Sequence, residues 1–91
     1  FRVKMPDEYT IAPHYHPADE HVTVISGTFK MGIGEKLDER AFKSMRAGSF
    51  IVMPKGTRHF ASADGETIIQ VHAIGPWSLT YVNPNDDPSK R

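Results

Sequence analysis

The chain contains no cysteine among its 91 residues. Thiolate metal sites, disulfide frameworks and cysteine nucleophiles are therefore excluded. The chain also lacks a surplus of charge, because 11 lysines and arginines balance 11 aspartates and glutamates. A balanced charge without a basic cluster argues against a nucleic acid partner. No apolar run approaches the roughly 20 residues of a membrane-spanning helix, which argues against a membrane partner as well.

The chain is short, so a single domain with a thin core is expected. A domain of this size buries only roughly 60–65% of its unfolded surface. Oligomerisation adds buried area, and a symmetric homodimer is the commonest form, so a homodimer is expected. The chain begins at Phe1 in a strand-like stretch without an initiator methionine. We therefore expect that residues preceded it, and the absence of a signal peptide carries little weight.

Short stretches of alternating apolar and polar residues dominate the sequence, separated by glycine, proline and aspartate. Many short strands at such spacing are typical of an all-β sandwich or barrel. They are expected at residues 2–5, 9–16, 21–26, 28–33, 49–53, 59–63, 67–74 and 79–82. One turn or two of helix is expected between Leu37 and Met45, with Asp38 as N-cap. Residues 1–83 are expected to form the domain, and 84–91 a polar tail.

His14 and His16 lie two residues apart in an expected strand. Residues i and i+2 of a strand point to the same face, so both imidazoles are expected to project together. Pro13 and Pro17 flank the pair and stiffen the backbone on each side. Glu20 follows four residues after His16 across a short turn, and can therefore reach back to the same point.

A second cluster consists of Gly48, Pro54, Gly56 and His59. The two glycines bracket a strand, GSFIVMPKG, and permit tight turns that a Cβ would obstruct. His59 then opens the following strand. Three neutral imidazoles and one carboxylate are a credible ligand set for one divalent metal ion. The sequence therefore predicts a mononuclear metal site made by His14, His16, Glu20 and His59.

Together the two clusters resemble the two motifs of the cupin superfamily, in the same order. The first reads H-x-H-x3-E-x6-G and ends at Gly27; the second reads G-x5-P-x-G-x2-H, about twenty residues later. The resemblance covers roughly residues 8–63. It implies a double-stranded β-helix, or jelly-roll, barrel with the four predicted ligands inside. Two positions depart from the motifs: Glu8 stands where the family usually has glycine, and Ala63 where it usually has asparagine.

Gln70 and His72 share one face of an expected strand, and the opposite face carries Ile69, Val71 and Ala73. If Gln70 and His72 face the interior, they support the metal ligands or contact a substrate. If the apolar face points inward, both lie on the outside. Periodicity alone leaves the two arrangements open.

Four further residues are candidates for contact with a substrate. Phe50 and Met53 could form pocket walls or belong to the core. Trp77 and Tyr81 follow the last long strand, where they could line the mouth of the barrel and stack on a sugar, or cap the barrel. His21 neighbours Glu20 and is expected to point the other way, to the surface or a dimer contact.

The resemblance implies a fold and one divalent metal ion more firmly than a reaction. The ligand set suits copper, iron, manganese, nickel or zinc, and the Irving–Williams order favours copper wherever it is available. The leading hypothesis is a metal-dependent oxidoreductase acting on a small molecule or a carbohydrate. Two alternatives remain: a metal-dependent binding or sensor protein without turnover, and a non-redox sugar isomerase.

The resemblance extends to compact bacterial cupins of a secreted type that includes copper-dependent enzymes cleaving cellulose oxidatively. The stretches that carry it are HPADEHVTVISGTF and GPWSLTYVNPNDDP. It implies a polysaccharide such as cellulose as the substrate, and a secreted or periplasmic location.

Overall fold

The computed structural model describes residues 1–73 and 78–87, and strands dominate this part of the chain. Two short 3₁₀ helices, η1 (Glu39–Ala41) and η2 (Pro84–Asp86), accompany the strands. The strands, in chain order, are β1 (Arg2–Met5), β2 (Thr10–Tyr15), β3 (Glu20–Ile33), β4 (Lys43–Arg46), β5 (Phe50–Met53), β6 (His59–Ala73) and β7 (Thr80–Tyr81).

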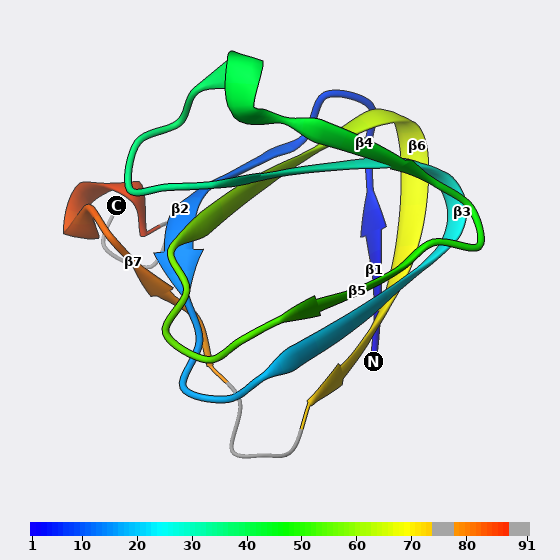
Figure 1. Cartoon of the computed structure of the whole chain (residues 1–91). Helices are drawn as coiled ribbons and strands as arrows, with labels where there is room; N and C mark the ends of the chain where they lie inside the picture. Colours follow the sequence, from blue (N-terminus) through cyan, green and yellow to red (C-terminus); the bar gives the residue numbers. More distant parts are fainter. Residues whose placement is uncertain (74–77, 88–91) are drawn as a thin grey trace.

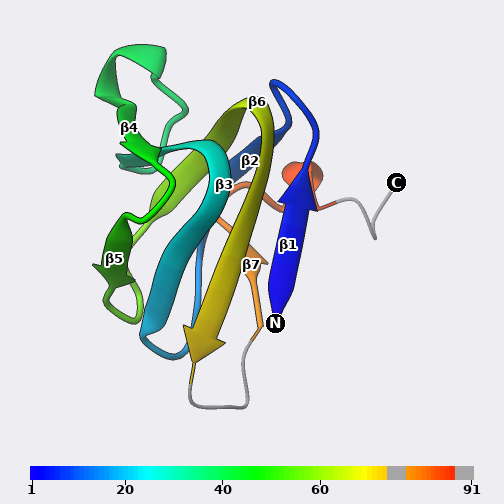
Figure 2. The same cartoon turned by 90° about the vertical axis from the view of Figure 1, so that its right-hand side faces the viewer.

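The two longest strands, β3 and β6, pair antiparallel along their whole length, from Glu20 opposite Ala73 to Ile33 opposite His59. Each then pairs on its other edge with two shorter strands. β5 and β1 flank the end of the β3–β6 ribbon near Glu20, whereas β4 and β2 flank the other end, and β7 joins β2. The chain curls into a barrel (Figures 1 and 2). The expected all-β jelly-roll fold is confirmed.

Gly27 and Thr67 mark the bend in the β3–β6 ribbon that brings its two halves face to face. The pairing register shifts on both sides of this point, between Val24 and Thr28. Gly27 has a φ of +78°, and a Cβ there would meet the backbone of Thr67 at 2.8 Å. The hydroxyl of fully buried Thr67 accepts a hydrogen bond from the N–H of Thr28. The bend therefore depends on a residue without a side chain.

The core lies between the two halves of the bent sheet. It consists of inward-facing apolar residues, among them Met5, Val22, Phe29, Met53 and Val71. Since inward and outward residues alternate along each strand, the core reflects the period of two in the sequence. No helix within the described residues is long and apolar enough to cross a membrane.

The structure corrects several strand boundaries. The expected strands 21–26 and 28–33 belong to the single strand β3. The expected strand 59–63 and residues 67–73 of the expected strand 67–74 belong to β6, and residue 74 lies outside the described residues. In the stretch from Leu37 to Met45, Asp38 caps η1 as expected, but the end of the stretch belongs to β4. β4 was not predicted because it is a short edge strand whose side chains are mostly polar and exposed, so it shows no alternating apolar pattern.

Candidate metal centre

His14 and His16 come from the end of β2, and a bulge directs them inward. The register of β2 against β6 shifts between Ile11 and His14. Ile11, His14 and His16 consequently line the same cavity, although the first two are three residues apart. Pro13 falls within the irregular stretch, where a residue without an N–H is tolerated. Both imidazoles are buried.

Glu20 and His59 complete the site from the starts of β3 and β6. Glu20 lies at the first position of β3, and His59 at the first position of β6. In the β3–β6 ribbon they sit at opposite ends. Only the bending of the ribbon into a barrel brings them together. Glu20 is 7% exposed and His59 is 1% exposed, so the metal ligands predicted from sequence are all buried.

Each of the three imidazoles is fixed by a hydrogen bond from Nδ1 to a main-chain carbonyl. His14 bonds to Ala12, and His59 to Thr57, at 2.7 and 2.8 Å. His16 bonds to the carbonyl of Ser78, which lies far along the chain, at 2.8 Å. Because a carbonyl oxygen only accepts, Nδ1 carries the proton in the neutral ring and Nε2 carries the lone pair. This is how a protein orients a histidine toward a metal ion.

The three imidazoles converge. One nitrogen from each histidine can be chosen so that the three lie within 4.8 Å of one another. The carboxylate oxygens of Glu20 are 3.4 Å from Nε2 of His16 and 3.9 Å from Nε2 of His59. Within the described part of the chain, the buried Nε2 of His59 has no hydrogen-bond partner. A buried lone pair without a donor is costly unless an ion or water meets it, so these residues fit a metal.

Burial sets the charge states of the site. It lowers the pKa of His14 from 6.5 to about 4, against the opposing effect of the bond to Ala12. Burial likewise lowers the pKa of His16 and of His59. Burial raises the pKa of Glu20 from 4.5 to about 7. The imidazoles are therefore neutral at pH 7 and ready to coordinate, which a protonated ring cannot do.

The site opens onto a small apolar cavity of about 60 Å³. Among the described residues that line it, only the four predicted ligands have ionisable side chains. The other side chains are apolar, and include those of Val3, Phe29 and Leu79. Water is accordingly scarce around the site, which strengthens electrostatic interactions within it. The volume is enough for an ion with one or two small molecules.

The structure places the other candidate residues in different surroundings. Met53 is buried in the core, and Tyr81 pairs with His14 across β2 and β7, their ring centroids 6.2 Å apart. Phe50 is 59% exposed and does not line the cavity. Trp77 lies outside the described residues.

Gln70 and His72 lie on the outer face of the barrel, because Ile69 and Val71 occupy the inward positions and line the cavity. The apolar side chains face inward because their burial in the core stabilises the barrel. Neither residue is brought to the histidine cluster. The carbonyls behind the imidazoles were missed by sequence reasoning, and no side-chain pattern could have signalled them.

Comparison with known proteins identifies one matching family and several solved structures with a similar fold. A family model described as "Cupin domain" matches residues 1–75. Germin-like protein 5-1 of Oryza sativa subsp. japonica is 38% identical over 56 residues, which are 60% of this chain and 25% of that protein. The chain thus spans a quarter of this curated relative.

Two solved structures resemble the chain. A cupin-2 domain containing protein from Shewanella frigidimarina is 27% identical, with a TM-score of 0.63, over 77% of this chain and 63% of that one. A conserved protein with a double-stranded β-helix domain from Klebsiella pneumoniae is 26% identical, with a TM-score of 0.67, over 87% and 70% of the two chains. The likeness extends over most of the barrel.

Proposed function

This chain belongs to the cupin family, and from that premise we propose that it is a metal-dependent oxidoreductase with one mononuclear centre. The observation that carries the proposal is the convergence of three neutral imidazoles, each fixed from behind by a main-chain carbonyl. The carboxylate of Glu20 faces two of them. Together they form a ligand set for one divalent ion.

The cavity favours redox chemistry over acid–base chemistry. Isomerisation of a sugar needs a general acid or base beside the metal. Among the described residues that line the cavity, Glu20 is the only carboxylate, and it already faces the imidazoles. A redox metal, once bound, supplies one-electron chemistry toward dioxygen or peroxide, which are small enough for the cavity. The chain's own groups then need only bind the ion and exclude water.

Copper is the ion we propose, because it binds nitrogen-rich sites most tightly among the divalent first-row metals. Iron, manganese, nickel and zinc suit the same ligands to a lesser degree. Copper is most available outside the cytoplasm, so the proposal includes a secreted or periplasmic location. The exposed apolar side chains of Phe50 and Val52 support the proposal of a homodimer, since association would cover them.

A polysaccharide such as cellulose is the proposed substrate, on the strength of the sequence resemblance. A cavity of about 60 Å³ has no room for a sugar ring. The polymer would therefore lie across the mouth of the barrel while the small oxidant enters. A small carbohydrate or another small molecule that reaches the mouth is the simpler variant of the same proposal.

The metal assignment is tested by elemental analysis of protein that has been loaded with copper and passed through a gel-filtration column. We expect about one tightly held ion per chain in the wild type and a loss of it in His59→Ala. His21→Ala is the matched control, because it removes an exposed histidine and leaves the buried cluster intact. Retention of the tight ion in His59→Ala would overturn the assignment.

The reaction is tested by incubating the copper-loaded protein with cellulose and a reductant or peroxide, and analysing the products by mass spectrometry. Oxidised sugars are expected from the wild type and not from His59→Ala. If copper is bound and no oxidised sugar forms, the polysaccharide proposal fails. Tight binding of an unmodified sugar or carboxylate, with no turnover, would instead identify a binding or sensor protein.

A further inference from the structure

The chain has five histidines, and three of them belong to the buried centre. The remaining two, His21 and His72, stand directly opposite each other on the paired strands β3 and β6. Both are exposed on the outer face of the barrel, while their neighbours Val22 and Val71 point into the core. All five histidines therefore lie in one of two clusters, one inside the barrel and one outside.

The register of β3 against β6 brings the two outer imidazoles within reach of a common ion. Directly opposed residues of an antiparallel pair have Cβ atoms about 4.5–5.5 Å apart, with both side chains on the same face. Imidazole nitrogens coordinate a transition metal at about 2.0–2.1 Å, and two rings rising from such positions can converge on one ion. The paired backbone fixes the separation before any ion arrives.

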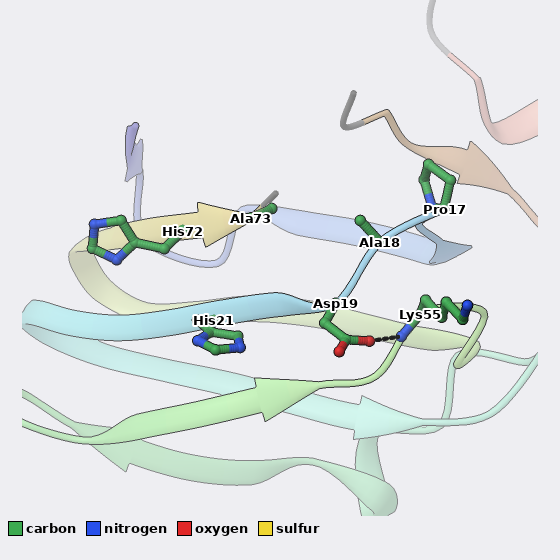
Figure 3. A pocket seen from close by; sticks show the side chains of 7 residues that line it. All are labelled: Pro17, Ala18, Asp19, His21, Lys55, His72 and Ala73. Carbon is green, nitrogen blue, oxygen red and sulfur yellow. Dashed lines mark hydrogen bonds between the residues drawn. The ribbon is translucent and has the colours of Figure 1, made fainter. Parts of the chain in front are cut away.

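Both imidazoles line one surface pocket of about 480 Å³ (Figure 3). Toward its other end lie Asp19 and Lys55, where the carboxylate of Asp19 accepts a hydrogen bond from the backbone N–H of Lys55 at 2.8 Å. Asp19 is the only carboxylate among the described residues that line the pocket. The pocket has room for an ion that keeps waters or an added ligand in its open positions.

Each of the two rings has one weak contact of its own. The ring of His21 packs edge-on against Phe50, with centroids 5.7 Å apart. Nε2 of His72 lies 3.0 Å from the amide nitrogen of Gln70, whose oxygen accepts a hydrogen bond from Arg2. The amide nitrogen therefore donates to His72. Exposed side chains change rotamer within nanoseconds, so an ion competes only with these contacts.

We propose that His21 and His72 form a second metal site, on the outer face of the barrel, that takes a divalent transition ion such as Cu²⁺, Ni²⁺ or Zn²⁺. Imidazole suits all three ions. With two protein ligands rather than four, the outer site binds more weakly than the buried centre and exchanges its ion readily. The site is independent of the proposed redox function, because it shares no ligand with the buried centre.

The test is a calorimetric titration at pH 7.5 of protein whose buried centre has first been filled with one equivalent of Cu²⁺. A further addition of Ni²⁺ is expected to give a second binding event of about one ion per chain. His21→Ala and His72→Ala should each weaken that event by about tenfold or more, since loss of even an outer-shell partner costs a metal site 10–100-fold. Both substituted positions are exposed, so the fold is expected to persist, and circular dichroism checks this.

Two controls separate the outer site from the buried one. Gln70→Ala, which removes the competing hydrogen bond, should leave the second event unchanged or tighten it. His59→Ala should lose the tight ion and keep the weak one. The proposal is overturned if the wild type shows no second event, or if the event survives unchanged in both His21→Ala and His72→Ala. If the buried centre bound no ion, the first equivalent of Cu²⁺ would occupy the outer site, so His59→Ala is also titrated with Ni²⁺ without prior copper. A binding event of about one Ni²⁺ per chain in that variant distinguishes failure of the buried centre from failure of the outer site.

Discussion

At the scale of single residues, Glu20 responds to burial in the opposite sense from the three histidines. Burial lowers the pKa values of the imidazoles below 6.5, so they are neutral at pH 7. The pKa of Glu20 is raised to about 7, so in the metal-free protein its carboxyl is half protonated near neutral pH. An incoming cation therefore displaces a proton from Glu20 but not from the histidines.

This difference predicts how metal affinity depends on pH. Between pH 7 and pH 5 the affinity of the buried centre should fall by up to about tenfold per pH unit, because one proton must leave Glu20. Because the pKa of Glu20 is raised to about 7, its carboxyl is increasingly protonated below that pH, and the proton competes with the metal ion. Competition titrations with a chelator of known affinity, at several pH values, measure the slope.

Glu20→Gln is the matched variant for this prediction. It keeps the shape of the side chain and removes the proton that the metal displaces. Its affinity should be lower at pH 7 and should fall less steeply below pH 7 than that of the wild type. A slope equal to that of the wild type would mean that another group, not Glu20, releases the proton.

Glu8 is a second residue with a measurable consequence. It is the only non-glycine residue with a positive φ, 61°, in the described part of the chain. It stands where the family motif usually has glycine. Its N–H donates to the carbonyl of Ala63 at 2.9 Å, so the two positions that depart from the motifs meet through their backbones. The turn keeps the left-handed conformation despite the exchange.

Replacing Glu8 with glycine should therefore stabilise the protein. A left-handed conformation costs a non-glycine residue about 1 kcal/mol, and glycine removes this cost. Glycine also raises the conformational entropy of the unfolded chain, which offsets part of the gain. We expect a gain of about 0.5–1 kcal/mol in the free energy of unfolding, measured by urea denaturation. Glu8→Ala, which keeps the strain, is the control and should show no gain.

The residue scale also shows what sequence reasoning could and could not reach. His14 and His16 were predicted because a period of two places them on one face, Glu20 because it follows across a short turn, and His59 because the two clusters resemble the cupin motifs. The direction of Gln70 and His72 stayed open because a period of two defines two faces without saying which is inside. That choice belongs to packing, and Ile69 and Val71 decide it.

At the scale of elements, β3 and β6 each run through a glycine that the sequence marks as a turn. Gly27 and Gly65 both have positive φ, which is why they signal a chain reversal. In the structure they bend continuous strands instead, because the β3–β6 pairing resumes on the far side. Local sequence indicates the backbone conformation of a glycine. Whether that conformation makes a turn or a bend depends on the pairing with a partner strand, which local sequence does not reveal.

The bend at Gly27 is tested by Gly27→Ala, with Gly48→Ala as its control. Both glycines have positive φ, but a Cβ at Gly27 would collide with Glu66 and Thr67, whereas the space around Gly48 is open. Strain alone should cost Gly48→Ala about 1–2 kcal/mol. The collision should bring the loss in Gly27→Ala to about 3 kcal/mol or more. Equal losses in urea denaturation would show that the bend relaxes around the added methyl.

At the scale of the whole molecule, the candidate metal centre joins β2, β3 and β6, of which β6 lies far along the chain from the other two. β2 supplies His14, the residue after β2 supplies His16, β3 supplies the carboxylate and β6 supplies His59. The carbonyl behind His16 comes from Ser78. The unfolded chain holds none of these groups together. A metal ion held by these groups would therefore bind the folded barrel far better than the unfolded chain, and would stabilise the barrel.

The resulting prediction is a large thermal shift. A metal present at a hundredfold excess over its dissociation constant adds about 2.7 kcal/mol to stability. For a domain of this size, that raises Tm by about 10 °C or more. Thermal unfolding followed by circular dichroism, with and without a chelator, measures it. His59→Ala should unfold at the same temperature in both conditions, and a full shift in that variant would contradict the prediction.

The three carbonyls behind the imidazoles are main-chain atoms of Ala12, Thr57 and Ser78. Every amino acid carries that oxygen, so an exchange of these side chains leaves the acceptor in place. We therefore expect the side chains at these three positions to vary more freely among relatives than the histidines do. The carbonyls that orient the metal ligands would then produce neither a conserved nor a covarying position. An alignment of relatives would identify the histidines but not the groups that orient them.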